Sequence, residues 1–198
     1  VITLNGDNYI IHEAGGAYLD ANATWADIVD GAGLLIGTGE VDISTPGEYV
    51  LSYNYTDQAG NEAVTVTRTI EVVDTTIPVI TLTGDANITR EAGDEYTDLG
   101  AIWMDIVEGE GTVTATGEVN VQVPGSYILS YNFSDVAGNE AVTVIRTVVV
   151  EDTTIPVITL NGDANITHEA GDEYIDQGAV WTDIVDGEGN ITATGEVD

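Results

Sequence analysis

Cysteine and lysine are both absent from this sequence of 198 residues. The lack of cysteine excludes disulfides, thiolate metal sites and cysteine nucleophiles. The lack of lysine excludes a lysine isopeptide crosslink within the segment, so any stiffening of the chain must be non-covalent. Only three arginines stand against 35 acidic residues, which gives a net charge of −32. Nucleic acid is therefore not an expected partner, because no positive surface exists to replace phosphate counterions.

Signals for membrane insertion and for catalysis are also missing. A membrane-spanning helix needs about 20 consecutive apolar residues. No apolar run approaches that length, so no membrane insertion is expected in this segment. A G-x-S-x-G nucleophile motif is absent. His12 and His168 occupy one repeated position, which is Arg90 in the middle copy, and this exchange argues against a general base. We therefore do not expect an enzyme.

An internal repeat dominates what is present. The hexapeptides ITLNGD, ITLTGD and ITLNGD begin at Ile2, Ile80 and Ile158, so the two intervals between them are equal. A period of this length indicates domains in tandem rather than a thin solenoid. We predict repeat 1 over residues 1–73, repeat 2 over 74–151 and repeat 3 over 152–198, the last holding only the first half of the pattern.

A long hairpin is the central prediction within each complete repeat. Apolar residues alternate with polar ones over 49–56 and again over 64–73, on either side of the turn sequence DQAGN. Short strands are predicted at 78–82, 86–90, 99–105, 112–116 and 118–123, with a glycine-rich turn at 108–111. No helical period is present, so the predicted fold is all-β, made of tandem immunoglobulin-like β-sandwiches.

Two features of the hairpin predict specific contacts. Tyr49 and Tyr127 stand in a PGxY motif, where a tyrosine hydroxyl of such sandwiches bonds nearby backbone. Arg68 and Arg146 fall in phase with inward apolar positions, so each is expected to pair with a loop carboxylate.

The order of these motifs resembles a known family. The stretches DTTIPVITLTGD, EAGDEY, GAIWMD and PGSYILSYNFSDVAGNEAVTVIRTVVV, in that order, are similar to the bacterial surface immunoglobulin-like repeat, found in large adhesins and in a pesticidal crystal-type protein. The resemblance implies a tandem extracellular β-sandwich that acts as a spacer or binding module. The expected location is extracellular, either on the cell surface or secreted.

Carboxylates recur near the DTTIP linkers, and they are the residues expected to bind a cation. Hard divalent cations prefer carboxylate and carbonyl oxygens, and calcium takes six to eight of them. No EF-hand spacing is present, so each acidic residue alone is also consistent with a turn or capping role. If the DxAGN loop lies beside the linker that enters its own repeat, an interdomain calcium site would form there. The candidate ligands are Glu13, Asp57, Asn61, Asp74, Glu91, Asp135, Asn139 and Asp152.

The sequence favours a spacer or fibre-building segment of an adhesin or extracellular fibre. Residues 74–120 and 152–198 differ at only ten positions, as expected of structural copies. The alternative is a glycan- or receptor-binding module of a secreted enzyme or toxin. Expected partners are neighbouring repeats of the same chain or of adjacent subunits in a fibre, together with a surface or glycan receptor. Repeat 3 lacks the hairpin, so its missing strands are expected from a continuation of the chain or from a neighbouring molecule.

Overall fold

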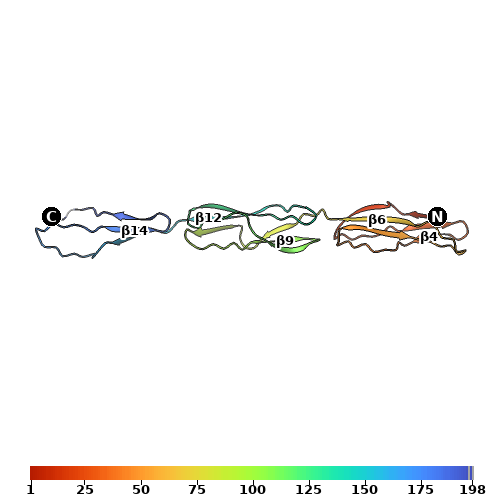
Figure 1. Cartoon of the computed structure of the whole chain (residues 1–198), viewed down its shortest axis with the longest axis horizontal. Helices are drawn as coiled ribbons and strands as arrows, with labels where there is room; N and C mark the ends of the chain where they lie inside the picture. The colour runs from red at the N-terminus through yellow and green to blue at the C-terminus, as the bar shows by residue number, and fades with distance from the viewer. Residues whose placement is uncertain (196, 198) are drawn as a thin grey trace. The chain divides into compact units, whose positions relative to one another are not determined.

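The computed structural model describes residues 1–195 and 197, and strands are the regular elements of this part of the chain (Figure 1). No helix occurs among these residues, and so none that is long and apolar enough to cross a membrane. Two positions of repeat 3, 196 and 198, lie outside the described residues. The all-β immunoglobulin-like prediction is confirmed.

Each complete repeat contributes two three-stranded sheets of matching order. In repeat 1 the first sheet is β1 (Ile2–Leu4), β3 (Ala23–Asp27) and β4 (Gly31–Leu35), and the second is β2 (Tyr9–Glu13), β6 (Val66–Val73) and β5 (Gly47–Tyr53). In repeat 2 they are β7 (Val79–Leu82), β9 (Ala101–Asp105) and β10 (Gly109–Val113), then β8 (Asn87–Glu91), β12 (Val144–Glu151) and β11 (Gly125–Tyr131). Repeat 3 has one sheet among its described residues, β13 (Val157–Leu160), β14 (Ala179–Asp183) and β15 (Gly187–Ile191).

The chain forms two compact units whose limits differ from the repeat limits. The first comprises Val1–Ile80, Ile102–Thr112 and Asn132–Val142, and the second comprises Thr81–Ala101, Val113–Tyr131 and Thr143–Asp198. The division into three domains that the sequence predicts therefore stays a prediction.

The predicted hairpin forms in both complete repeats. In repeat 1, β5 and β6 pair antiparallel from Gly47 with Val72 to Tyr53 with Val66, and β11 and β12 repeat this register in repeat 2. Leu51, Tyr53, Ile70 and Val72 are buried on one face of this ladder, as alternation requires. Val64 was predicted to face inward with them but is 87% exposed, because the ladder ends at Val66 before a looser loop.

A buried arginine joins the hairpin to the first half of each complete repeat, and it pairs with a loop carboxylate as predicted. The Arg68 side chain is fully buried, and its guanidinium binds the Asp20 carboxylate. Its Nε donates to the carbonyl of Asp7 at 2.8 Å, and Nη2 donates to the carbonyl of Asn5 at 2.7 Å. The Tyr53 hydroxyl donates to the same Asp20 carboxylate at 2.7 Å.

Repeat 2 reproduces this arrangement. Arg146 binds the Asp98 carboxylate and donates to the carbonyl oxygens of Asp85 and Thr83 at 2.9 and 2.6 Å. The predicted tyrosine contacts are also present, since the Tyr49 and Tyr127 hydroxyls each donate to the carbonyl four residues earlier at 2.8 Å.

Two strand predictions in repeat 2 were wrong. No strand forms over 118–123, because the Asn120 side chain accepts the Gln122 amide at 3.0 Å and turns the backbone there. The predicted turn at 108–111 and strand at 112–116 are replaced by β10 over Gly109–Val113. The residue at position 111 of this strand is glycine because a Cβ there would be 2.7 Å from the Trp103 ring, which covers it. Trp103 stacks in turn on Phe133, with ring centroids 4.1 Å apart.

Candidate functional site

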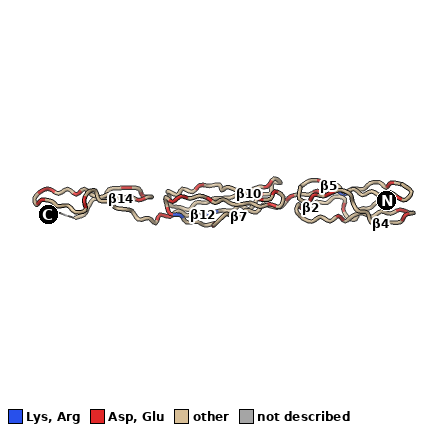
Figure 2. Tube along the Cα trace, turned by 90° about the horizontal axis from the view of Figure 1, so that it is seen from below, with Lys and Arg blue, Asp and Glu red and all other residues tan. Residues whose placement is uncertain are grey.

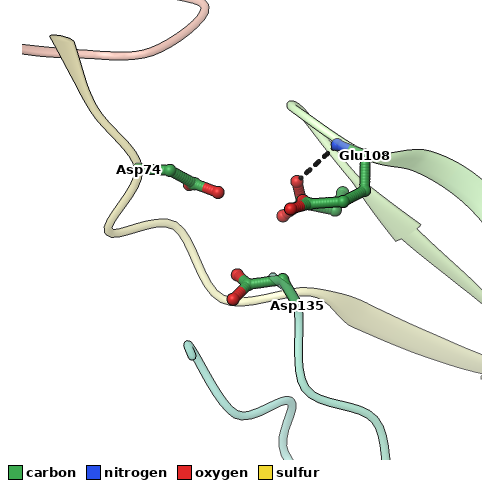
Figure 3. Close-up of side chains that lie close together, drawn as sticks. Asp74, Glu108 and Asp135 are labelled. Carbon is green, nitrogen blue, oxygen red and sulfur yellow. Dashed lines mark hydrogen bonds between the residues drawn. The ribbon is translucent and has the colours of Figure 1, made fainter. Parts of the chain in front are cut away.

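Four carboxylates of the first compact unit meet at the linker between repeats 1 and 2. Asp74 follows β6 directly, Asp105 ends β9, Glu108 precedes β10, and Asp135 lies in the loop after β11. One oxygen from each carboxylate lies within 4.8 Å of one oxygen from each of the others. Figure 3 shows Asp74, Glu108 and Asp135 pointing toward one another from three separate segments. We refer to these four residues as the linker cluster.

Local backbone bonds hold the cluster side chains in place. Asp105 Oδ1 accepts the amides of Val107 and Glu108 at 2.7 and 3.2 Å. Glu108 Oε1 accepts the Val136 amide at 3.2 Å, which ties the β9–β10 turn to the DxAGN loop. The carboxylates are thus oriented by their own turns before any ligand arrives.

Asn139 connects the DxAGN loop to the linker. Its backbone and side-chain amides donate to the two Asp135 oxygens at 2.6 and 2.8 Å. The side-chain amide also donates to the Asp74 carbonyl at 3.1 Å. The loop therefore lies beside the linker that enters its own repeat, which is the arrangement on which the sequence prediction depended.

Three oxygens of the cluster are buried without a hydrogen-bond partner. They are Asp74 Oδ2, Asp105 Oδ2 and Glu108 Oε2. Asp74 and Asp105 are only 8% and 7% exposed, and Asp135 is 8% exposed. A buried polar group left unpaired costs about 1–3 kcal/mol, and more when it is charged. Asp74 and Asp105 each bear such a cost unless something binds them.

The carboxyl groups of the cluster shift one another's pKa values. Burial, together with the nearby charges of Asp105 and Asp135, raises the pKa of Asp74. The close carboxyl of Asp105 raises the pKa of Glu108, and burial acts in the same direction. Burial opposes ionisation of Asp105, but the Glu108 carboxyl in its protonated form, followed by the backbone amides of Val107 and Glu108, outweighs it and lowers the Asp105 pKa. Negative charge is thus concentrated where little water reaches it.

A divalent cation is the ligand that such a set can bind. Calcium binds oxygens at about 2.3–2.6 Å, so two ligands on opposite sides of one ion lie about 4.6–5.2 Å apart. The spacing in the cluster fits a single ion of this kind. Four carboxylates offer eight oxygens, and three of these are buried without a hydrogen-bond partner.

The structure brings together only part of the predicted ligand set. Asp74 and Asp135 lie in the cluster, and Asn139 braces it through hydrogen bonds. Glu13 was a candidate ligand, but its carboxylate instead accepts the Thr75 amide at 2.8 Å and the hydroxyls of Thr75 and Thr76 at 2.7 and 2.9 Å. These bonds satisfy both of its oxygens.

Glu91 has the same role at the second linker, in the second compact unit. It accepts the amide and hydroxyl of Thr153 at 2.8 and 2.7 Å, and the hydroxyl of Thr154 at 2.8 Å. These bonds lower the pKa of Glu91 to about 2. Asp152 accepts the Thr154 amide at 3.3 Å and joins no acidic cluster among the described residues.

The remaining candidates, Asp57 and Asn61, are the counterparts in repeat 1 of Asp135 and Asn139. Asn61 donates its backbone and side-chain amides to the Asp57 oxygens, each at 2.7 Å. This loop therefore has the same internal bonds as the cluster loop. No cluster around Asp57 is found within the described part of the chain.

Two cluster residues were not among the calcium ligands predicted from the sequence. Asp105 follows a tryptophan by two and Glu108 opens the next turn, and both positions recur as acidic residues in all three repeats. That recurrence was the available signal. It was compatible with a turn role, and both residues do cap turns while presenting a second oxygen to the cluster.

A steric contact accompanies each linker. In the first compact unit the Ile106 side chain lies over Gly15, where an added Cβ would be 2.4 Å from Ile106 Cδ1. In the second unit Ile184 lies over Gly93 in the same way, with the Cβ at 2.3 Å. The positive φ of the EAG turn favours glycine there, and an added Cβ would also displace the isoleucine side chain above it.

Comparisons with known proteins agree with this architecture. The family described as bacterial surface protein, Ig-like domain matches residues 2–72 and 80–150. A hyalin from Lytechinus variegatus is 32% identical over 127 residues, which cover 60% of this chain and 24% of the hyalin. A hyalin from Strongylocentrotus purpuratus is 33% identical over 129 residues, which cover 61% of this chain and 11% of that protein. The matched part is thus about a quarter or less of each hyalin.

Among solved structures, the lipoprotein BT2262 from Bacteroides thetaiotaomicron aligns over 92% of each chain at 16% identity and a TM-score of 0.34. The family match alone covers well over half of the chain, and it coincides with the two repeats that carry complete pairs of sheets. The chain therefore belongs to the family of bacterial surface protein Ig-like domains.

Proposed function

We propose that this chain is a non-catalytic structural segment of an extracellular protein, in which a calcium ion at the linker cluster fixes repeat 2 to the end of repeat 1. The surface-protein family and the tandem sandwich repeats support the structural role. Acidic residues lie along all the repeats, whereas basic ones are few (Figure 2). Such a surface attracts cations and resists non-specific association.

The observation that carries the calcium proposal is the set of unpartnered buried oxygens. Carboxylates in turns are ordinary, and most are satisfied by backbone amides or water. Here the oxygens that are not satisfied belong to three different residues, and those residues lie together in one largely buried cluster. A bound divalent cation would neutralise half of the four negative charges and supply every missing partner.

The position of Asp74 gives the ion a mechanical consequence. Asp74 is the residue directly after β6, the last strand of repeat 1, whereas Asp105, Glu108 and Asp135 belong to repeat 2. An ion that binds all four joins the exit of one sandwich to two turns of the next. Bending at the linker would then require breaking metal–oxygen bonds. The chain has no cysteine or lysine and so cannot form disulfides or lysine isopeptide bonds. Calcium would stiffen the linker in their place.

Thermal unfolding with and without calcium tests the proposal. Calcium binds only the folded cluster, so a concentration about 100-fold above the dissociation constant adds about 2.7 kcal/mol of stability. The chain should therefore melt at a higher temperature in millimolar calcium than in chelator. Asp135→Asn, which preserves side-chain shape but removes a charge, should remove most of this difference.

Asp57→Asn is the matched control. It makes the same change in the same loop of repeat 1, where the amides of Asn61 hold the aspartate in the same way but no cluster forms among the described residues. It should leave the calcium-dependent shift intact. Identical melting in calcium and in chelator for the unaltered chain would contradict the proposal.

A further inference from the structure

One dipeptide of repeat 1 contains a side chain and a backbone nitrogen that can react with each other. Asn5 directly follows β1 and is followed by Gly6. The carbonyl carbon of an asparagine side chain is an electrophile, and the backbone nitrogen of the next residue can attack it to close a succinimide ring. Glycine hinders that attack least, because it has no Cβ. The same positions of repeat 2 are Thr83 and Gly84, which lack the electrophile.

The surroundings of Gly6 leave its nitrogen accessible. Gly6 is exposed, and apart from its chain neighbours no atom lies within 4 Å of the position that a Cβ would take. Its amide donates no hydrogen bond to any described residue. No acceptor therefore holds this nitrogen away from the Asn5 side chain, and water has free access to the dipeptide.

Three hydrogen bonds hold Asn5 around the reacting atoms. Its backbone amide donates to the Asn22 carbonyl at 3.0 Å. Its side-chain Nδ2, the nitrogen that leaves in such a reaction, donates to the Ala21 carbonyl at 3.1 Å. Its own backbone carbonyl accepts Nη2 of Arg68 at 2.7 Å. A positive charge thus lies against the peptide group whose nitrogen would attack.

The position of Arg68 does not depend on Asn5. The arginine side chain is fully buried, and its guanidinium also binds the Asp20 carboxylate. Its Nε donates to the Asp7 carbonyl at 2.8 Å. A donor that its surroundings have already fixed in place needs no reorganisation when charge develops on its acceptor.

The buried guanidinium favours ring closure. The Gly6 nitrogen loses its proton to solvent as it attacks, and amide resonance spreads the resulting negative charge onto the Asn5 carbonyl oxygen. Arg68 donates to that oxygen and so stabilises the charge. A bond forms between the Gly6 nitrogen and Asn5 Cγ. The bond between Cγ and Nδ2 breaks, and this nitrogen takes up a proton and leaves as ammonia.

The same contact selects the product when water opens the ring. Water that adds to the former backbone carbonyl of Asn5 breaks the bond from this carbonyl to the Gly6 nitrogen. The chain then continues through Cβ and Cγ as isoaspartate, and the former carbonyl becomes a carboxylate. Arg68 donates to the oxygen on which negative charge develops during this addition. The new carboxylate forms beside the guanidinium, for which it is a stronger acceptor than a neutral carbonyl.

We propose that Asn5 is a site of spontaneous conversion to isoaspartate, promoted and directed by the buried Arg68. The reaction consumes water, releases ammonia and adds a negative charge to repeat 1. It modifies the joint at which the hairpin arginine meets the first half of this repeat. Repeat 2 cannot undergo the change, because residue 83 is threonine. The reaction does not involve the linker cluster and is independent of calcium.

Peptide mapping of the chain during incubation at mildly alkaline pH tests the proposal. Mass spectrometry with electron-based fragmentation distinguishes asparagine, aspartate and isoaspartate, and it separates residue 5 from Asn161, where the Asn-Gly dipeptide recurs. Isoaspartate should form at residue 5 faster in the folded chain than in the chain unfolded by urea, because unfolding removes Arg68 from the Asn5 carbonyl. The ratio of isoaspartate to aspartate should also be higher in the folded chain.

A short peptide of residues 1–12, incubated with and without urea, corrects for any effect of urea on the chemistry itself. Asn5→Thr, which introduces the residue of repeat 2, should abolish the change at this position. Slower conversion in the folded chain than in urea would overturn the proposal. A product ratio that is the same in both states would overturn the directing role of Arg68.

Transfer of the dipeptide to repeat 2 provides a matched gain of reactivity. Arg146 Nη2 donates to the Thr83 carbonyl at 2.6 Å, as Arg68 does to the carbonyl of Asn5. Thr83→Asn should therefore create a second reactive site. Adding Arg146→Met to this variant should slow the reaction at residue 83 at least about tenfold, which corresponds to about 1.4 kcal/mol in the barrier. A Thr83→Asn chain that stays unmodified at this position, or that reacts equally fast with and without Arg146, would overturn the role of the arginine.

Discussion

Replacement of the buried Arg146 by methionine should destabilise repeat 2 far more than the same change at an exposed arginine. Methionine preserves an unbranched apolar stem but removes the guanidinium, which binds Asp98, Tyr131 and the backbone carbonyls of Thr83 and Asp85. Asp98 then loses the only cation that contacts it in the described structure.

The size of the effect follows from the exposure of the two partners. Breaking a buried ion pair by removing one member costs about 3–5 kcal/mol. The arginine side chain is fully buried but the Asp98 side chain is 23% exposed, so water can partly solvate the remaining carboxylate. We therefore expect the lower end of the range, about 3 kcal/mol. Asp98→Asn in the same chain should recover part of this loss, because it removes the uncompensated charge.

Urea unfolding followed by tryptophan fluorescence measures the change. With a denaturant slope of about 1–3 kcal/mol per molar, a loss of about 3 kcal/mol lowers the midpoint by roughly 1–3 M. Arg90→Met is the matched control, because Arg90 is exposed in the same repeat and should change stability by less than about 0.5 kcal/mol. Arg68→Met should shift the transition of repeat 1 instead. Equal midpoints for Arg146→Met and Arg90→Met would show that the buried guanidinium stabilises repeat 2 no more than an exposed one does.

Three further predictions concern the linkers and the core. Gly15→Ala should lower the thermal midpoint more than Gly171→Ala, because both residues have positive φ but only the first lies under an isoleucine side chain. The Thr153 amide resonance should titrate with a midpoint of about 2, since hydrogen bonds from Thr153 lower the pKa of Glu91 to that value from 4.5. The stabilisation of the linker by Glu91 is therefore complete above pH 4.5 and is lost as the pH falls through about 2. A midpoint near 4.5 would contradict these hydrogen bonds. Burial and the bond to Asp98 raise the pKa of Tyr131 from 10.0 to about 12. The contribution of Tyr131 to the free energy of unfolding should therefore be complete below pH 10 and decline between pH 10 and about 12. Ultraviolet titration showing every tyrosine of the folded chain ionising together at the ordinary pKa would argue against this bond.

The sequence was sufficient for the fold because the relevant signals are local and repeated. Alternation in β5 and β6 fixes which side chains face inward, and an arginine in phase with them requires a carboxylate partner. The regular spacing of the repeats allowed each inference to be checked against a second copy. The errors came where side chains redirect the backbone, as Asn120 does when it accepts the amide of Gln122. They also came where a ring covers a glycine in a strand, as Trp103 covers Gly111.

The linker cluster was only half predictable for a different reason. The sequence shows which carboxylates recur, but it does not show which of their oxygens remain unsatisfied after the turns have formed. Glu13 was expected near the ion, yet the linker threonines bind both of its oxygens. Their sequence positions predict that Asp105 and Glu108 are turn residues, and both do accept backbone amides in their turns. Each also has a second oxygen that is buried without a hydrogen-bond partner. That distinction needs three-dimensional geometry.

Calorimetric titration of the chain with calcium measures binding at the linker cluster itself. We expect a saturable site with one ion per chain that is lost in Asp135→Asn and in Asp105→Asn, and that persists in the matched Asp57→Asn chain. The same titration in the variants separates a built site from diffuse attraction to a surface of charge −32, which salt would screen and no single substitution would abolish. Heat of binding that is absent, or that is equal in the unaltered chain and in Asp135→Asn, would contradict a calcium site at the linker cluster.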